Sequence, residues 1–464
     1  MHSKYHDLVK KITNTSIGIT KNQDFKYRGY TADLNGIGIV GFNKVARSSW
    51  YRNSSDKKIW NITENDPLQR GATTKNYTLL LDESVAFDFD VNYNNLISKT
   101  ENVYNQSGVG VFPYWILLQS QTSTDYFTYF VKKKEYLQYT TPYFLPTQIK
   151  TSNYFGTHLE GTTLIVTEFD SDTTVGLNYH IGRPIEVVTT KEVFVNTPNG
   201  NSDIKIFDEI YSYSNSDLVY VEKNSNNDPG SINEIYQYYP NGLLKSKTLN
   251  QIGFPSTTSN GDRTTQYTYD ATNRFVETVT DTEGLVTTNI SFDPLYGLVT
   301  EQKNHLNQST KSVYDNWGKR TKVTDVYGVS TNYNYVRSNN IYTTTTTVTD
   351  ASGTSDGSES IVDQNILAQE IRKGAKDLNG NWIYVNTEYD YLGRKKRQSE
   401  PYFANNSPSQ WNTIDYDDYS RPIQNTSYTG KIITMVYNGT TAIVTDPVLS
   451  KSKTVNSLGA VITA

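Results

Sequence analysis

The sequence predicts an all-β protein in which repeated hairpins stack into one long antiparallel sheet. Three observations predict this fold class: several segments alternate apolar and polar residues, a tyrosine–aspartate phrase recurs along the chain, and the composition favours strands. The chain has 37 Tyr but only 2 Met and 14 Pro, and it is rich in Thr, Asn and Ser. Such residues suit half-solvated strands and turns better than helices.

The bulk properties exclude several functions. With 464 residues the chain has room for two or three domains, and its net charge of -5 argues against a general role on nucleic acid or at a membrane surface. The absence of Cys excludes disulfides, thiol catalysis and thiolate metal sites, and it suits an exported bacterial protein. The longest apolar run, FPYWILL at residues 112–118, is far shorter than the roughly 20 residues that span a bilayer. No signal peptide is visible at the N-terminus.

Alternation is clearest at residues 84–95, where Val85, Phe87, Phe89 and Val91 fall on one face and polar residues mainly on the other. That period of two predicts a strand with one dry and one wet face. Residues 341–350 are rich in β-branched side chains and also predict a strand. Residues 360–377 have a weak helical rhythm, but their place in the repeat described next favours strand.

An internal repeat organises the second half of the chain. The markers lie 21–27 residues apart, at Tyr269–Asp270, Phe292–Asp293, Tyr314–Asp315, Tyr335–Val336, Val362–Asp363, Tyr389–Asp390 and Tyr416–Asp417. A turn and a basic residue follow many of them, as Gly393 and Arg394 follow Asp390. Between markers, D-x-x-G recurs at Asp281–Gly284, Asp325–Gly328 and Asp350–Gly353. Each unit therefore predicts strand, tight turn, strand and second turn.

The repeated phrase has a physical reason. Tyr supplies a large apolar body with a polar tip that needs a hydrogen-bond partner. Asp starts a turn by accepting bonds from the backbone that follows it, and Gly accepts the positive φ of the turn. One hairpin cannot bury its apolar face alone, whereas stacked hairpins can. We expect a degenerate β-rich segment over residues 1–230 and the repeat array over residues 231–464. Residues 224–231 between them also fit a long loop within one continuous sheet.

Residues 386–422 read NTEYDYLGRKKRQSEPYFANNSPSQWNTIDYDDYSRP, and residues 27–45 read YRGYTADLNGIGIVGFNKV. Together they resemble the Rhs/YD-repeat family, in particular the shell region of toxin-complex B and C components and SpvB-associated Rhs proteins. The resemblance is specific over residues 260–464 and loose over residues 20–260. It implies a sheet that spirals around a hollow holding an unfolded or toxic segment. This chain lacks the family's acidic self-cleaving motif and the variable toxin, so we expect a partial shell.

Two motifs suggest ligands but have simpler explanations. Gly36, Gly38 and Gly41 spell G-x-G-x-x-G, yet no helix signal follows, so a turn before a packed strand is favoured over a nucleotide site. Asp377, Asn379, Asn381 and Glu388 have the spacing of calcium ligands. Trp382 occupies the position where a calcium loop needs glycine, so a hairpin turn is favoured, as it is for residues 33–38.

Other candidate sites are weaker still. The basic run of Arg394, Lys395, Lys396 and Arg397 is divided between the two faces of a strand, which favours a solvated turn over phosphate binding. The histidines show no triad or metal spacing; they are His2, His6, His158, His180 and His305. Scattered Trp and Tyr fit packing between hairpins better than sugar stacking. We therefore assign no catalytic, cofactor-binding or metal-ligating residue.

These observations predict a non-catalytic shell fragment that encloses, carries or docks another polypeptide in an exported toxin or surface system. The partner would be a cargo, the remainder of a split shell or a secretion component, with no nucleic acid and no membrane insertion. The alternative is a secreted adhesin that binds carbohydrate or protein, and an enzyme hidden in the N-terminal half is a third option. We expect secretion, or display on a bacterial surface, by a route that reads no N-terminal signal here.

The end of the chain predicts an association. Residues 460–464, AVITA, are apolar and uncharged, so a terminal strand there would lack the charges that protect sheet edges. We expect a partner chain to cover this strand by adding a strand of its own, so that the protein is not a free monomer. Deleting residues 458–464 should weaken that complex and leave the central repeats folded.

Overall fold

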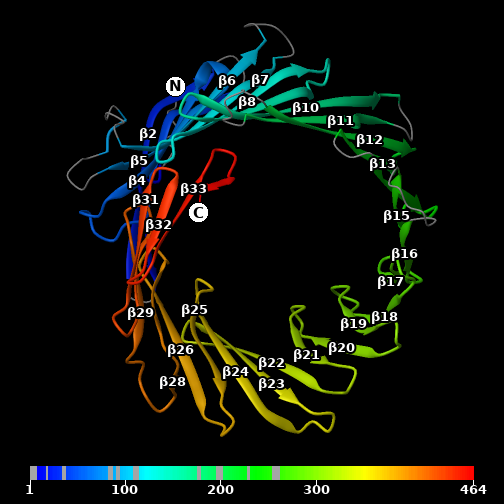
Figure 1. The fold of residues 1–464 in the computed structure, drawn as a ribbon, viewed down its shortest axis with the longest axis vertical. Coiled ribbons are helices and arrows are strands. Elements are labelled where there is room, and N and C mark those ends of the chain that lie inside the picture. The colour runs from blue at the N-terminus through cyan, green and yellow to red at the C-terminus, as the bar shows by residue number, and fades with distance from the viewer. Residues whose placement is uncertain are drawn as a thin grey trace.

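The structure is a computed structural model that describes residues 8–16, 19–33, 38–81, 87–89, 95–107, 114–174, 179–194, 202–226, 230–252 and 262–463. The described residues form one 34-stranded sheet and a single 3-10 turn, η1 (Pro67–Gln69) (Figure 1). The prediction of an all-β protein built from stacked hairpins is confirmed. Residues 360–377, where a helical rhythm competed with strand, lie mostly in two strands joined by a turn.

In chain order the strands are β1 (Lys11–Ser16), β2 (Ile19–Asp33), β3 (Gly38–Ser48), β4 (Lys58–Asp66), β5 (Ala72–Leu81), β6 (Leu96–Gln106), β7 (Ile116–Asp125), β8 (Phe130–Tyr139), β9 (Pro146–Phe155), β10 (His158–Asp172), β11 (His180–Phe194), β12 (Ser202–Ser214), β13 (Asp217–Ser225), β14 (Ser231–Tyr238), β15 (Leu244–Ile252), β16 (Arg263–Tyr269), β17 (Val276–Thr280), β18 (Val286–Phe292), β19 (Val299–Lys303), β20 (Ser309–Tyr314), β21 (Arg320–Thr324), β22 (Ser330–Ser338), β23 (Ile341–Thr349), β24 (Ser355–Asn365), β25 (Glu370–Lys376), β26 (Trp382–Tyr389), β27 (Lys395–Ser399), β28 (Tyr402–Phe403), β29 (Trp411–Tyr416), β30 (Pro422–Thr426), β31 (Ile432–Asn438), β32 (Thr441–Thr445), β33 (Ser450–Val455) and β34 (Val461–Thr463).

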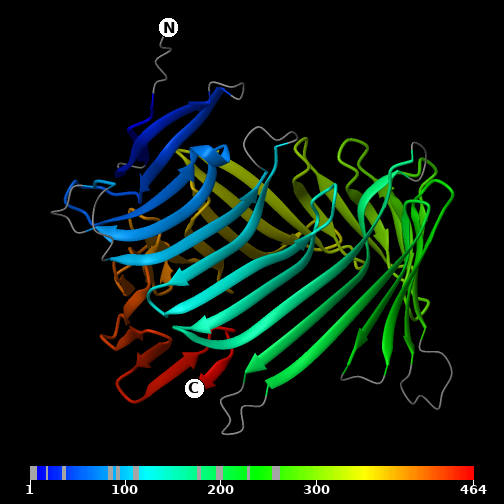
Figure 2. The same cartoon turned by 90° about the horizontal axis from the view of Figure 1, so that it is seen from above.

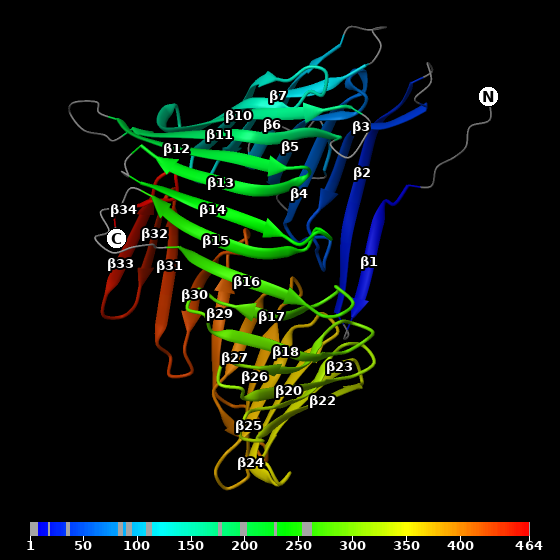
Figure 3. The ribbon, with the colours of Figure 1, turned by 90° about the vertical axis from the view of Figure 1, so that its right-hand side faces the viewer.

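The sheet is a meander in which each strand pairs antiparallel with the next. The exception lies around β28, which pairs with β26, while β27 pairs with both β26 and β29. β13 pairs directly with β14, so the sheet continues through the region where the two sequence segments meet. Figure 3 shows the succession of strands from β10 to β20 running across one side of the molecule.

The sheet curls into a ring with an open centre (Figure 1). Neighbouring strands in a sheet are rotated relative to one another, and over many strands this twist accumulates into curvature. The ring overlaps itself as a spiral does: in Figure 2 the C-terminal strands lie below the N-terminal strands. The turns of this meander alternate between the two edges of the sheet, because consecutive strands run in opposite directions.

We call one of the two edges of the sheet the tyrosine edge. It carries the described turns that follow even-numbered strands up to β26, including those at residues 270–275, 293–298, 315–319, 339–340, 365–369 and 390–394, and then the turns at residues 417–421, 439–440 and 456–460. The other edge, called the opposite edge, carries the remaining turns, such as those at residues 49–57, 126–129, 281–285, 325–329 and 377–381.

The most deeply buried apolar cluster lies near the N-terminus, on β3, β4 and β5. Trp60, Ile62 and Leu79 are almost completely buried there, and Trp60 stacks on Phe87 with ring centroids 4.0 Å apart. Most other described strands have partly exposed residues on both faces, because a single-layer sheet has no second layer to bury them.

The strand predicted at residues 84–95 is not supported where the structure describes it. Phe87, Asp88 and Phe89 lie outside any strand, and the rest of that stretch is outside the described residues except Asn95, which is in a turn. Phe87 and Phe89 instead cover the buried cluster, with ring centroids 5.3 Å apart. At Phe87 and Phe89 the apolar positions of the pattern reflect packing onto this cluster and not pairing within the sheet.

Among the described residues we find no helix with the length and apolar character needed to cross a membrane.

Candidate functional site

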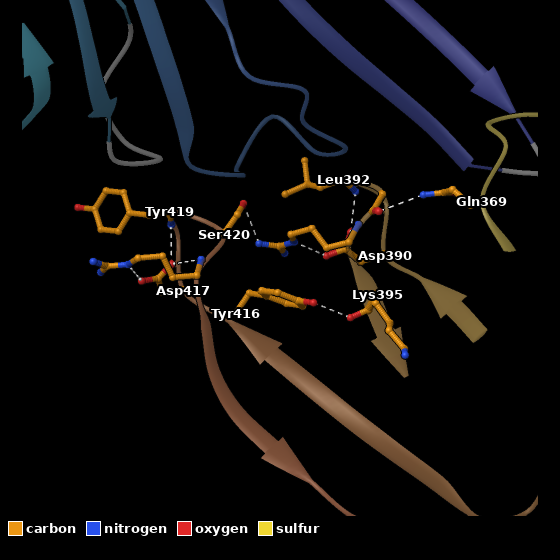
Figure 4. Close-up of polar contacts among 11 residues, drawn as sticks. Gln369, Asp390, Leu392, Lys395, Tyr416, Asp417, Tyr419 and Ser420 are labelled. Atoms are coloured by element: carbon orange, nitrogen blue, oxygen red, sulfur yellow. Dashed lines mark hydrogen bonds and ion pairs between the residues drawn. The ribbon is translucent and has the colours of Figure 1, made fainter. Parts of the chain in front are cut away.

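The aspartate turns have a common geometry, shown for two units in Figure 4. Asp390 Oδ1 accepts hydrogen bonds from the backbone N–H groups of Leu392 and Arg394, each 2.9 Å long. The backbone closes the same loop, since the N–H of Asp390 donates to the carbonyl of Arg394 at 2.8 Å. Gly393 has φ of 85°, a left-handed conformation that glycine adopts without a Cβ penalty. Asp417 repeats this pattern two strands later in the sheet.

The other predicted aspartates of the repeat form comparable turns. Asp315 Oδ1 accepts from the N–H groups of Trp317 and Lys319, both at 2.9 Å. Asp270 and Asp293 also accept bonds from the backbone of the turns that follow them. The D-x-x-G turns at Asp281, Asp325 and Asp350 use the same carboxylate bonds on the opposite edge.

The prediction that each aspartate marker of the repeat begins a turn is wrong for one marker. Asp363 does not begin a turn but lies within β24, where it is 3% exposed and ion-paired with Arg372. Asn365, two residues later, takes the turn position, and its Oδ1 accepts from the N–H groups of Leu367 and Gln369. An Asn side chain makes the same turn as Asp, so Asn365 and not Asp363 is the turn residue of this unit.

The tyrosines of the repeat tie each strand to the start of its neighbour. The hydroxyl of Tyr389 donates to the carbonyl of Glu370 at 3.0 Å. The hydroxyl of Tyr416 donates to the carbonyl of Lys395 at 2.8 Å (Figure 4). Tyr269, Tyr314 and Tyr335 make equivalent bonds to the carbonyls of Leu244, Val299 and Arg320. Phe292 lacks the hydroxyl, and its ring stacks on Phe275 with centroids 4.9 Å apart.

The basic residue of the turn links successive units. The Nε of Arg394 donates to Asp390 Oδ2 at 2.6 Å, and its guanidinium carbon lies 4.5 Å from the ring centre of Tyr416. Arg421 repeats both contacts, with Asp417 and with the ring of Tyr437. Cation–π contacts of this kind contribute roughly 0.5–1 kcal/mol each at exposed sites. In these two units the basic residue thus couples its turn to the next tyrosine along the tyrosine edge.

Replacing Tyr416 with Phe tests the contribution of these tyrosine hydroxyl bonds to stability. We expect the free energy of unfolding of the C-terminal strands to fall by about 0.5–1.5 kcal/mol, because one hydrogen bond to the Lys395 carbonyl is lost while the ring remains. Urea unfolding followed by circular dichroism measures the change. The control is Tyr428→Phe, at an exposed tyrosine on the opposite edge. Equal effects of the two substitutions would contradict the role of the Tyr416 hydroxyl.

The aspartate turns also predict that the stability of the fold depends on pH. Hydrogen bonds from the Thr272 hydroxyl and the Phe275 backbone lower the pKa of Asp270 to about 2, and the pKa values of Asp350, Asp377 and Asp446 are lowered by comparable bonds. A carboxylate whose pKa is depressed by folding stabilises the fold above its unfolded pKa, about 4. We therefore expect the melting temperature to fall as the pH drops from about 4 towards 2. Asp270→Asn should make that decline shallower.

A seam forms where the ring overlaps itself, between the tyrosine edge of the C-terminal strands and the opposite edge of the N-terminal strands. Lys57 Nζ, on the loop between β3 and β4, lies 2.7 Å from Asp418 Oδ2 in the turn after β29. The ring of Phe127, between β7 and β8, packs edge-on against Tyr419 with centroids 4.5 Å apart. The guanidinium carbon of Arg421 lies 5.0 Å from the centre of the same Phe127 ring.

The seam continues to the last strands. Glu160 Oε2, at the start of β10, accepts a 2.7 Å hydrogen bond from the backbone N–H of Ser457. Leu458 lies close to Gly161, where an added Cβ would come within 3.3 Å of its methyl groups. Glycine at position 161 therefore leaves space for Leu458. The Glu160–Ser457 contact joins residues 297 positions apart, and the Lys57–Asp418 contact joins residues 361 positions apart. The ends of the open sheet therefore meet through these contacts along the seam.

A cavity of about 520 Å³ lies near the start of the seam. Asn14 and Lys21 from the β1–β2 hairpin face residues of β24–β26 and the turn at residues 390–394 across it. Apolar side chains such as Leu367, Ile371 and Tyr391 form much of its wall. Lys21 forms no ion pair in the described part of the chain, although its Nζ lies 5.1 Å from the ring centre of Trp50. Such a volume is in the usual range for ligand pockets.

The other candidate motifs occupy ordinary structural positions. Asp377 Oδ1 accepts backbone bonds from Asn379 and Asn381, and Glu388 forms a bidentate pair with Arg397. Gly38 and Gly41 lie in β3, whereas Gly36, His2 and His6 are outside the described residues. His180 bonds to Asp170 at 3.0 Å, and Asp170 also pairs with Arg183. The described ranges contain no group of three or more His, Asp or Glu side chains placed to hold a metal ion.

The contacts of the seam were not predicted from the sequence. Lys57, Phe127 and Glu160 belong to loops and strands of the N-terminal half, where the repeat pattern is degenerate. Their partners lie in the last units of the repeat array. No spacing along one sequence identifies such pairs, because they depend on how far the sheet curves before it meets itself.

No family model matches the chain. No curated protein matches it either.

Solved structures are similar to it in fold. The crystal structure of TcdB2-TccC3 matches 96% of this chain with a TM-score of 0.65 and 10% identity. A TcdB2-TccC3-TEV structure matches with a TM-score of 0.68 and 10% identity, and the Photorhabdus luminescens Tc holotoxin pore with a TM-score of 0.60 and 11% identity. This chain spans about a third of the length of each, at 33%, 35% and 34%. The likeness supports an Rhs-like shell fold for this chain, and at this level of identity it concerns the fold alone.

Proposed function

We propose that this chain is a non-catalytic segment of an Rhs-type shell that encloses or carries another polypeptide. The observation that carries the proposal is the ring: one continuous sheet curves around an open centre and meets itself along a side-chain seam (Figure 1). Most of the described strands of this single-layer sheet bury few apolar side chains, so the shape of the sheet and not a buried site is its distinctive feature.

The likeness to toxin-complex structures supports the same proposal. By analogy with them, the chain would act in an exported toxin or surface system, with a cargo, the rest of a shell or a secretion component as its partner. Fold-level analogy does not by itself assign function, so the proposal depends on a direct test with a polypeptide.

Protease protection provides that test. The purified chain is incubated with fluorescein-labelled, carboxymethylated lactalbumin, a polypeptide that stays unfolded, and trypsin is then added. We expect digestion of the labelled polypeptide to slow at least ten-fold, whereas folded lactalbumin with its disulfides intact gains no protection. Without trypsin the labelled polypeptide should remain whole, because the shell is proposed to be non-catalytic. Digestion at an unchanged rate would contradict enclosure, and cleavage without trypsin would contradict the non-catalytic role.

A secreted binding module is the second candidate, and the seam cavity favours it. Its wall combines amide groups, such as Asn14 and Gln369, with the rings of Tyr389 and Tyr391. Amide and aromatic groups together suit a sugar, because they offer hydrogen bonds and a stacking face. A glycan array probed with the intact chain and with Tyr391→Ala distinguishes the candidates. A signal that disappears in the variant supports sugar binding at the cavity, and an array without signal removes it.

A further inference from the structure

Both edges of the ring carry rows of exposed apolar residues at the tips of their turns. On the opposite edge, Leu306 is 62% exposed, Tyr327 is 78% exposed and Leu378 is fully exposed. On the tyrosine edge, Leu295 is 72% exposed and Trp317 is 87% exposed. Leu306 and Tyr327 lie in neighbouring opposite-edge turns, and Leu295 and Trp317 lie in neighbouring tyrosine-edge turns. Leu378 lies farther along the opposite edge, beyond the turn at residues 350–354. Exposed apolar side chains that gather into one contiguous surface mark interaction sites.

The seam shows how such turns bind one another. There the Tyr419 ring, at the tip of a tyrosine-edge turn, packs on Phe127 from an opposite-edge turn. An ion pair beside it joins Asp418 to Lys57. A tyrosine-edge turn therefore docks on an opposite-edge turn through an apolar tip and a pair of opposite charges. The turns outside the seam have the apolar tips of this arrangement on both edges: they are the tyrosine-edge turns between β16 and β23 and the opposite-edge turns between β17 and β26.

The turns outside the seam also carry opposite charges. Exposed acidic residues lie on the opposite edge, at Asp281, Glu283 and Asp325. Exposed basic residues lie on the tyrosine edge, at Arg274, Lys319 and Arg337. The signs are reversed relative to the pair in the seam, but the two edges are again complementary. Complementary charges guide association and select the partner.

We propose that a second copy of this chain stacks on the first, edge to edge. Its tyrosine-edge turns between β16 and β23 rest on the opposite-edge turns between β17 and β26 of the first copy. One chain carries both complementary rows, and they lie on opposite edges of the same strands, so stacking along the ring axis brings them together. The contact is head-to-tail, and such contacts continue from copy to copy. Repeated addition extends the ring into a tube, beyond the enclosure proposed for one chain.

Sedimentation velocity of the full chain over a hundred-fold range of concentration tests this stacking. We expect the average sedimentation coefficient to rise with concentration, and to rise further at low salt because the opposing charges are less screened. One variant combines Tyr327→Asp and Leu378→Asp on the opposite edge. The other combines Leu295→Asp and Trp317→Asp on the tyrosine edge. Each variant alone should associate at least ten-fold more weakly than the wild-type chain.

Mixing the two variants is the decisive step, because each keeps one intact edge. An equal mixture should form dimers and nothing larger, since the intact tyrosine edge of one copy binds the intact opposite edge of the other. The control Ile290→Asp changes a 47% exposed residue in the middle of β18 and should associate like the wild-type chain. Circular dichroism checks that every variant is folded.

The opposite results are equally clear. A wild-type chain that remains monomeric at every concentration overturns the proposal, and so does undiminished association of both edge variants. If the wild-type chain is monomeric alone but binds a different shell protein through these edges, the proposal that a second copy of this chain covers them is wrong. The protease-protection test measures enclosure by one ring, so its outcome is independent of stacking.

Discussion

Replacing Arg372 with Met is expected to lower the free energy of unfolding of the repeat array by about 3 kcal/mol, because it leaves a buried carboxylate without its partner. Asp363 is 3% exposed, and its Oδ2 lies 2.6 Å from an amino nitrogen of Arg372. Its other oxygen accepts a 2.6 Å bond from the Thr343 hydroxyl. Arg372 is itself partly exposed, which places the expected loss at the lower end of the range for broken buried pairs.

The same experiment includes its own controls. Combining Arg372→Met with Asp363→Asn removes the buried charge and keeps an oxygen for Thr343, so most of the lost stability should return. Arg337→Met removes an exposed arginine from the tyrosine edge and should change the stability by less than about 0.5 kcal/mol. Urea unfolding measures all three, and hydrogen exchange of β24–β26 shows whether the loss is local. A single Arg372→Met variant as stable as the wild type would contradict the buried ion pair.

Cross-linking the seam is the second change with a large expected effect. The chain contains no Cys, so Lys57→Cys and Asp418→Cys provide the only thiols for a short bismaleimide. The wild-type side chains at these positions meet at 2.7 Å, so we expect an intramolecular link in the folded protein and none in urea. The link should raise the free energy of unfolding by about 2–4 kcal/mol, because it closes a long loop in the unfolded chain.

A distant cysteine pair is the control for proximity. Lys57→Cys combined with Asp281→Cys places the second thiol on an exposed opposite-edge turn outside the seam. This pair should not form the intramolecular link. If both pairs react at the same rate, or if the Lys57 and Asp418 pair links only between molecules, the ring does not close where the seam places it.

Much of the fold was predictable because the repeat is local chemistry. An Asp or Asn that accepts bonds from the next few backbone N–H groups makes its turn without distant contacts, as Asp315 and Asp390 do. Strand alternation and β-propensity act over similarly short distances. The prediction of a turn at Asp363 was wrong because it used only this local pattern. In the structure Asp363 is buried and ion-paired with Arg372, and it lies inside a strand.

By itself, then, the sequence determined the all-β class, the hairpin repeat and the positions of most turns, since these depend on bonds between residues a few positions apart. Only the tertiary structure decided that the array curves into a ring, that the tyrosine edge of the last strands meets the opposite edge of the first, and that Phe87 and Phe89 cover the N-terminal core. Those features depend on small rotations between neighbouring strands summed over the whole sheet. No local segment carries that sum, which is why Lys57 and Asp418, 361 positions apart, come together only in the folded chain.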